Sequence, residues 1–152
     1  MESSQRESMW SSIRCNVTAI TYIPNILVGA LSETDTKLNW ILPCIRILGN
    51  LIGNKACPEL AIQITEMLIN HPNISLILVK SLEHERCAVR KESAYLIALM
   101  LCVSPGFSSS DICTNLVTTS LVRMVVIDLM EVKQEALRCL FNIAINQRYI
   151  CS

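Results

Sequence analysis

Residues 132–143 read VKQEALRCLFNI, and the related stretch VRKESAYLIA occupies residues 89–98, at an offset of 43 residues. A third stretch, IRILGNL at residues 45–51, matches LRCLFNI at residues 137–143 at an offset of 92, about two such periods. Periods of about 40 to 47 residues with two or three helices each are typical of stacked helical-repeat arrays. One unit cannot bury its apolar face alone, so neighbouring units stack into a continuous core. The sequence therefore predicts an all-α, right-handed solenoid of about three repeats.

The domain organisation follows from this register. We expect a polar N-terminal tail over residues 1–15, a repeat domain over residues 16–147, and a C-terminal tail over residues 148–152. The three repeats are expected at about 16–54, 58–103 and 111–147. Within them, apolar residues at helical spacing predict helices at about 24–31, 38–52, 58–68, 74–82, 87–102 and 132–146, with two further apolar stretches at 112–117 and 121–130.

Four residues indicate where these helices start, kink or approach a neighbour. Pro58 suits a helix start, and Pro43 is expected in a first turn or at a kink, because a proline deeper in a helix costs about 3 kcal/mol. Gly49 lies inside its predicted helix, where glycine costs about 1 kcal/mol relative to alanine, so we expect a neighbouring helix to approach closely there. Asp111 is the predicted N-cap after a loop at 104–110.

Composition narrows the class of partner. The chain of 152 residues is 51% hydrophobic and 17% charged, with no formal net charge, so it can fill a core and leave apolar surface for a neighbour. A nucleic-acid-binding domain is usually basic, with a clustered patch. The one tight basic cluster is Arg86, Arg90 and Lys91. We therefore expect a protein or peptide partner and no nucleic acid.

Signals for export, membrane insertion and metal binding are missing from the sequence. The first dozen residues are polar, without the apolar core of a secretory signal, and no apolar run approaches the roughly 18 residues that span a bilayer. We expect no membrane span and an intracellular protein, cytoplasmic or nuclear. The eight cysteines form no C-x-x-C pair, and His71 and His84 are not at zinc-ligand spacing from them. Cysteines such as Cys44, Cys102 and Cys139 are interpreted as buried structural thiols, and no metal or cofactor is expected.

The repeated stretches resemble the armadillo repeats of the importin-alpha family. The third helix of those repeats reads approximately [VI]-x-K-E-A-x-W-x-[IL]-x-N-[IL]; VKQEA and NIA within residues 132–144 follow it, and VRKESA at 89–94 follows its first half. PCIRILGNLI at residues 43–52 is similar to the P-x-L-R-x-x-G-N-I variant found in middle repeats. The resemblance covers about residues 20–147. The order of segments also resembles the C-terminal part of a divergent relative of this family.

The resemblance implies a peptide-binding groove lined by the third helices. In the family, an asparagine clamps the backbone of an extended peptide, and a tryptophan four residues earlier stacks on a lysine stem. The asparagine role falls on Asn50 and Asn142 and is lost at Leu99. The tryptophan role falls on Arg46, Tyr95 and Arg138, which complete the set of candidate groove residues. Because an arginine repels a lysine, the groove is expected to prefer acidic or neutral segments. The alternative is that Asn50 and Asn142 only bond neighbouring turns and that the arginines are solvated.

Catalysis has little support in the sequence. No nucleophile elbow, Gly-rich phosphate loop or H-E-x-x-H pattern is present. Glu83, His84 and Glu85 cluster in a link that is interpreted as a solvated loop and not as an acid–base site. We therefore expect a non-enzymatic interaction scaffold. The alternatives are a divergent importin-alpha-like cargo adaptor for nuclear import, or a partial fragment of a longer armadillo protein.

The last predicted helix points to self-association. Its apolar residues spread around much of the circumference: Leu137, Leu140, Phe141, Ile143 and Ile145. Solenoids need terminal repeats with a polar outer face, and too few residues follow this helix to form such a cap. Self-association through uncapped solenoid ends is therefore expected.

Overall fold

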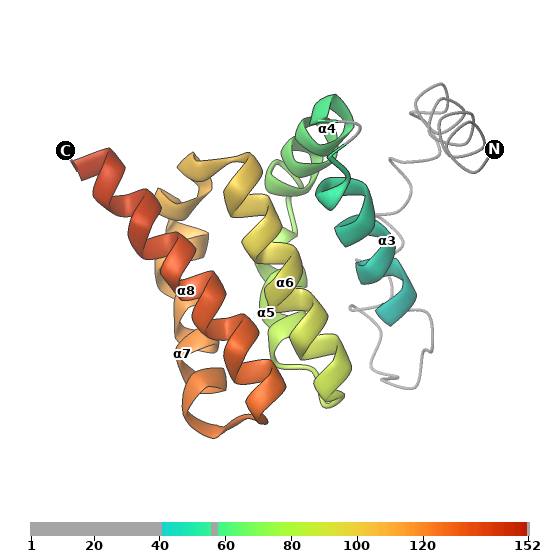
Figure 1. The fold of residues 1–152 in the computed structure, drawn as a ribbon, viewed down its shortest axis with the longest axis vertical. Helices are drawn as coiled ribbons and strands as arrows, with labels where there is room; N and C mark the ends of the chain where they lie inside the picture. The colour runs from blue at the N-terminus through green and yellow to red at the C-terminus, as the bar shows by residue number, and fades with distance from the viewer. Residues whose placement is uncertain (1–40, 56–57, 152) are drawn as a thin grey trace.

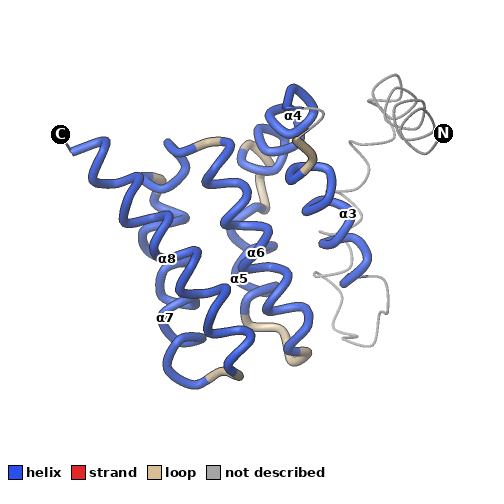
Figure 2. The backbone as a smooth tube through the Cα atoms, viewed as in Figure 1, coloured by secondary structure: helices blue, strands red, loops and turns tan. Residues whose placement is uncertain are grey.

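The computed structural model describes residues 41–55 and 58–151, and within these ranges it contains helices, turns and loops but no strand (Figure 2). The elements follow in this order: α3 (Ile41–Gly53), α4 (Pro58–Ile69), α5 (Ile74–Leu82), α6 (Cys87–Val103), the 3₁₀ turn η1 (Pro105–Ser109), the π-helical η2 (Ile112–Val117), α7 (Thr118–Ile127) and α8 (Met130–Cys151). The all-α prediction is thereby confirmed. The tail predicted at 1–15 and the helix predicted at 24–31 lie outside the described residues.

Most predicted helix positions agree with the structure. Pro58 opens α4, followed by an acidic Glu59 in the first turn, where a negative charge complements the helix dipole. Pro43 is the third residue of α3, within its first turn. The predicted helices at 74–82 and 87–102 are α5 and α6. α8 continues to Cys151, five residues beyond the end that was predicted at 146.

The helices form two layers around one core. α6 lies between α3 and α8 and packs against both, and α5 and α7 lie behind this row (Figure 1). α4 packs against α3 and α6. The largest fully buried side chains come from both layers and include Leu48, Ile64, Ile97, Leu101 and Leu121. The helices predicted at 38–52, 87–102 and 132–146 carry the repeated stretches, and their described parts α3, α6 and α8 lie side by side, as expected of neighbouring units that stack.

Gly49 and Gly53 of α3 both face side chains of α6. A Cβ atom built on Gly49 would meet the Tyr95 ring of α6 at 4.0 Å, and one on Gly53 would meet Leu99 at 3.5 Å. These are ordinary van der Waals distances, so a methyl group would also fit at either position. A neighbouring helix does lie against Gly49, as predicted, but its approach is not close enough to require glycine.

The segment between η1 and α7 differs from its prediction. The N-cap is Ser110 and not Asp111: Ser110 has extended backbone angles, and its hydroxyl accepts a hydrogen bond from the backbone N–H of Cys113 at 3.2 Å. Asp111 is already helical and its side chain makes no capping bond. The apolar stretches at 112–117 and 121–130 are also joined, because the π-helical η2 runs directly into α7. The Thr118 hydroxyl donates to the Cys113 carbonyl, five residues back, at 2.6 Å.

α8 is the longest helix of the described part, yet it carries charged residues throughout. Among residues 41–55 and 58–151, no helix combines the length and the apolar character needed to cross a membrane.

Candidate functional site

The five candidate groove residues lie on α3, α6 and α8, the three helices of the row. Arg46, Tyr95 and Arg138 occupy equivalent positions of the repeat, since 46 and 138 are 92 residues apart and 95 and 138 are 43 apart. All three are exposed. Asn50 is exposed and Asn142 is half-buried, each four residues after an arginine and therefore on the same side of its helix.

Carboxylates accompany both arginines of the row. Arg46 Nε on α3 lies 3.8 Å from Glu92 Oε1 on α6, so this ion pair links two neighbouring helices. Arg138 Nη1 lies 3.6 Å from Glu135 Oε2 one turn earlier on α8. Both distances are long and both arginine side chains are more than half exposed, so each pair contributes at most a few tenths of a kcal/mol up to about 1 kcal/mol. A partner carboxylate could displace Glu92 from Arg46 at small cost, whereas Glu135 is only 15% exposed and its Oε2 is buried, so Arg138 would have to bind a guest without leaving that glutamate.

The two asparagines differ in their surroundings. The side-chain amide of Asn142 donates a long contact to the Cys102 thiol of α6 at 3.8 Å, and Asn146, one turn later, donates to the Leu101 carbonyl at 3.4 Å. Of the two interpretations left open by the sequence, bonding to a neighbouring helix therefore applies to Asn142, whereas the Asn50 side chain is exposed and no residue within 41–55 or 58–151 bonds it.

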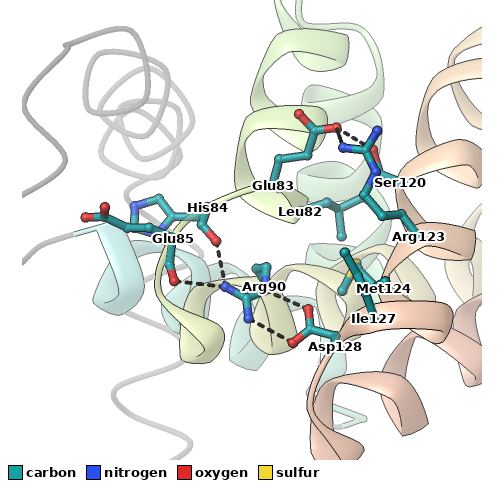
Figure 3. A pocket seen from close by; sticks show the side chains of 10 residues that line it. All are labelled: Leu82, Glu83, His84, Glu85, Arg90, Ser120, Arg123, Met124, Ile127 and Asp128. Atoms are coloured by element: carbon teal, nitrogen blue, oxygen red, sulfur yellow. Dashed lines mark hydrogen bonds and ion pairs between the residues drawn. The ribbon is translucent and has the colours of Figure 1, made fainter.

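A second site, missed by the sequence analysis, centres on Arg90. Its guanidinium bonds Asp128 through two contacts, Nε to Oδ2 at 2.7 Å and Nη2 to Oδ1 at 2.8 Å. Nη1 donates to the main-chain carbonyls of His84 at 2.8 Å and Glu85 at 2.9 Å (Figure 3). Arg90 thus joins the α5–α6 link to the end of α7. A planar guanidinium suits this task, because it presents several donors in fixed directions.

Asp128 lies at the junction of α7 and α8. Together with Arg90 and the His84 and Glu85 carbonyls it forms a bonded cluster, called the Arg90–Asp128 lock below. The Asp128 side chain is only 6% exposed, and its Oδ1 also accepts the backbone N–H of Leu129 at 2.8 Å. The hydrogen bonds from Arg90 hold the pKa of the Asp128 carboxyl below its usual range, with the Leu129 N–H as a further cause. The sequence grouped Arg90 with Arg86 and Lys91 as a basic cluster; in the structure its charge is taken up by a carboxylate 38 residues away.

A cavity of about 310 Å³ adjoins the lock, between the α5–α6 link and α7. Apolar side chains of Leu82, Met124 and Ile127 line one part of it. At its rim Glu83 accepts a hydrogen bond from the Ser120 hydroxyl at 3.3 Å and lies 3.5 Å from Arg123 (Figure 3). Four of the charged side chains around the cavity are therefore paired, Glu83 with Arg123 and Arg90 with Asp128.

His84 departs from the solvated link that the sequence predicted. It is only 9% exposed, and its Nδ1 accepts the backbone N–H of Arg86 at 3.1 Å. Its Nε2 is buried without a hydrogen-bond partner. Burial lowers the pKa of the imidazole, and the nearby Arg86 and Arg90 lower it further, while Glu85 opposes them. Glu83 and Glu85 are exposed, as a link residue would be. The turn buries His84 because its ring nitrogen closes the turn while Arg90 fixes the carbonyls around it.

The described cysteines only partly match the buried-thiol interpretation. Cys113 and Cys139 are buried, and burial raises the pKa of Cys113 to about 11 and that of Cys139 further. Cys44 is half-buried, but Cys87 and Cys102 are exposed. For Cys102 the interpretation was wrong, since its position on α6 faces outward beside Asn142. Within the described ranges, no group of histidine, cysteine and acidic side chains is arranged to hold a metal ion.

No protein-family model matches this chain, and comparisons with curated proteins and with solved structures found no significant match.

Proposed function

We propose that the chain is a non-enzymatic protein-interaction scaffold, an armadillo-type solenoid that binds an extended peptide or partner segment along the α3–α6–α8 row. One observation carries the proposal. The repeat-equivalent residues Arg46, Tyr95 and Arg138 are all exposed on three helices that lie side by side. A chain running across the row would meet the same position of the repeat on each helix in turn, which is how repeat proteins use their extended surfaces.

The chemistry of the row favours an acidic or neutral guest. Arg46 and Arg138 occupy two of the three stacking positions, and their glutamate neighbours hold them loosely. Tyr95 lies against α3 at Gly49, so one edge of its ring is occupied by packing. The exposed Asn50 amide, which no described residue bonds, offers a donor and an acceptor to the backbone of an extended peptide. A carboxylate of the guest would replace Glu92 at Arg46 and would add to the contact of Arg138 with Glu135, and no acid–base or nucleophilic step is part of the proposal.

Two alternatives differ from the scaffold in the guest they bind or in the strength of binding. A divergent importin-alpha-like cargo adaptor would bind basic segments, which two arginines at stacking positions disfavour. A piece of a longer armadillo protein would bind the same guest as the scaffold but more weakly than the longer chain, because further repeats extend the surface.

The experiment measures fluorescence anisotropy with three labelled peptides of about twelve residues, in which Gly-Ser alternates with Glu, with Asn or with Lys. The glutamate peptide should bind most tightly and weaken with added salt, since its contacts are exposed. The double variant Arg46→Glu with Arg138→Glu should lose the glutamate peptide by about tenfold or more.

Arg123→Glu is the matched control. Arg123 is exposed to the same degree as the two row arginines, 62% against 56% and 60%, and likewise lies beside a glutamate, but it belongs to α7. It should leave glutamate-peptide binding within about twofold. Tightest binding of the lysine peptide would favour the adaptor, and equal losses in the control would place the peptide elsewhere.

A further inference from the structure

The turn between α7 and α8 concentrates exposed aliphatic side chains. Val126, Ile127, Leu129 and Met130 are 60 to 73% exposed, and among the other large apolar residues of the described chain only Phe141 reaches this range. These four residues, named the apolar tip, lie at one end of the molecule, where α7 and α8 meet (Figure 1). Single exposed apolar residues are common on protein surfaces, but four at one turn indicate a contact surface.

The repeat register shows that a further repeat would not cover the apolar tip. At an offset of 43 the tip corresponds to the end of the α5–α6 link and the start of α6. α6 has a neighbour on both sides, α3 and α8, so its surroundings show what stacking covers. Three of the four tip positions are nevertheless exposed there: Glu83 for Val126, Arg86 for Leu129 and Cys87 for Met130. Stacking covers the flanks of these helices and leaves this end open.

The Arg90–Asp128 lock holds the apolar tip in its outward arrangement. Asp128 is the polar residue in the middle of the tip, and its carboxylate turns inward to Arg90, so that only 6% of its side chain is exposed (Figure 3). Its neighbours Ile127 and Leu129 are left on the outside, 73% and 60% exposed. The one polar side chain of the turn is therefore removed from the surface, and the aliphatic ones are presented by a fixed backbone.

Two features of the tip fit a lipid surface better than a groove in a protein. Its side chains carry no hydrogen-bonding group, whereas protein interfaces carry about one hydrogen bond per 100–200 Å² and favour Tyr, Trp and Arg. The backbone N–H groups of the two turn residues are bonded within the turn, Asp128 to the Met124 carbonyl at 3.1 Å and Leu129 to Asp128 Oδ1 at 2.8 Å. Backbone donors that enter an apolar phase need such internal partners.

We propose that the apolar tip inserts into the interface of a lipid bilayer and holds the chain reversibly on a membrane surface. The charges next to the tip are balanced in sign: Arg123 lies beside Glu83, and Glu131 and Lys133 follow on α8. Apolar insertion, and not attraction to anionic lipid, should therefore supply the affinity. The apolar content of four aliphatic side chains is comparable with one myristoyl chain, so half of the protein should be bound at roughly 0.1 to 1 mM lipid. The inference goes beyond the proposed function, because no residue of the α3–α6–α8 row belongs to the tip.

Sedimentation of the 152-residue chain with vesicles tests the proposal. Vesicles of phosphatidylcholine alone and of phosphatidylcholine with about 30% phosphatidylserine should bind the chain within about threefold of each other, with little effect of added salt. The double variant Ile127→Gln with Met130→Gln should weaken binding about tenfold or more, because two aliphatic side chains are lost from the inserted surface. It leaves the charge unchanged, and since the two residues are 73% and 69% exposed, it should keep the native melting profile.

Leu137→Gln with Phe141→Gln is the matched control. It exchanges two apolar residues of the α8 flank that are 52% and 64% exposed, again without a change of charge. It should leave vesicle binding within about twofold of the native chain. Both double variants should keep the binding of the glutamate peptide, so a failure of the membrane proposal leaves the proposed function standing.

A second measurement tests insertion itself. In vesicles with brominated acyl chains, which quench tryptophan on contact, Leu129→Trp should lose fluorescence relative to the native chain. Phe141→Trp, with the same two native tryptophans as background, should not.

Four results would each overturn the proposal. They are no sedimentation with either vesicle at about 5 mM lipid, equal losses in the two double variants, binding confined to phosphatidylserine vesicles and removed by salt, and no extra quenching of Leu129→Trp. The first of them would assign the apolar tip to a protein partner.

Discussion

α6 and α8 carry the same sequence pattern 43 residues apart and have different surroundings. Both direct the same positions to the core: Val89 on α6 and its equivalent Val132 on α8 are buried. On the flank, however, Ala98 of α6 is 4% exposed and its equivalent Phe141 of α8 is 64% exposed. α6 lies between α3 and α8, whereas α8 has a described helical neighbour on one side of the row only. The repeat pattern thus defines which side of a helix faces the core, while the neighbours decide whether its flank is covered.

The largest expected effect comes from introducing a charge at the two equivalent flank positions. Ala98→Asp should destabilise the fold by about 4 kcal/mol or more, because it buries an unpaired carboxylate between α6 and α8. Phe141→Asp should change the free energy of unfolding by less than about 0.5 kcal/mol, because the Phe141 side chain is 64% exposed. Urea denaturation followed by circular dichroism measures both. Similar losses in both variants would show that the two flanks are equally covered.

A smaller difference is expected between Arg90 and its equivalent on α8, Lys133. Arg90 holds the nearly buried Asp128 and two link carbonyls, so Arg90→Ala should cost about 3 kcal/mol, mainly by leaving the carboxylate uncompensated. Lys133→Ala should cost about 0.5 kcal/mol or less, as is usual at positions without such a network. The measurement is again urea denaturation. Equal losses of stability at the two positions would show that the bonds of Arg90 to Asp128 and to the link carbonyls do not stabilise the fold.

The features that could be predicted from the sequence are local or periodic. The positions of α4, α5 and α6 followed from apolar spacing and from Pro58, and the approach of α6 to α3 followed from Gly49. The helix positions depend on interactions within a few residues, and the approach of α6 was inferred from the missing side chain of Gly49. The repeat register also gives the equivalence of Arg46, Tyr95 and Arg138, while their choice as candidate groove residues came from the family resemblance.

The features that were missed depend on distant partners or on competing local bonds. Nothing near Arg90 in the sequence signals that Asp128, 38 residues later, will accept its guanidinium. Arg90 also bonds the carbonyl of His84. Because that bond is not visible in the sequence, the polar link was predicted to be solvated, although His84 is buried. Ser110 and Asp111 are both good caps, and the choice between them depends on which backbone is extended. A serine directly before a candidate cap is the one signal that could have been weighed.

The smallest expected effect compares the two histidines, one in each link flanking α5. Both accept the backbone N–H two residues later at 3.1 Å, but His84 is the one that is almost fully buried. Because burial lowers the His84 pKa, the unfolded chain binds a proton more readily than the folded chain. Stability is therefore complete above the ordinary histidine pKa of about 6.5 and declines as the pH falls below it.

Melting temperatures measured between about pH 7.5 and 5 test this sign. His84→Asn keeps an acceptor for the Arg86 N–H and should flatten the decline. His71→Asn, the same exchange in the α4–α5 link, should leave the decline in place. A profile that His84→Asn leaves unchanged would assign the acid sensitivity to other groups.

Peptide binding to Asn50 and Asn142 variants tests most directly the claim that the α3–α6–α8 row is a binding surface. Anisotropy titrations with the glutamate peptide would compare the native chain with Asn50→Ala, Asn142→Ala and the exposed α4–α5 link control Asn70→Ala. Asn50→Ala should raise the dissociation constant about fivefold to tenfold, the equivalent of one hydrogen bond, and Asn142→Ala less, because its amide already contacts Cys102. Asn70→Ala should have no effect. A native affinity that neither row variant changes would contradict the account.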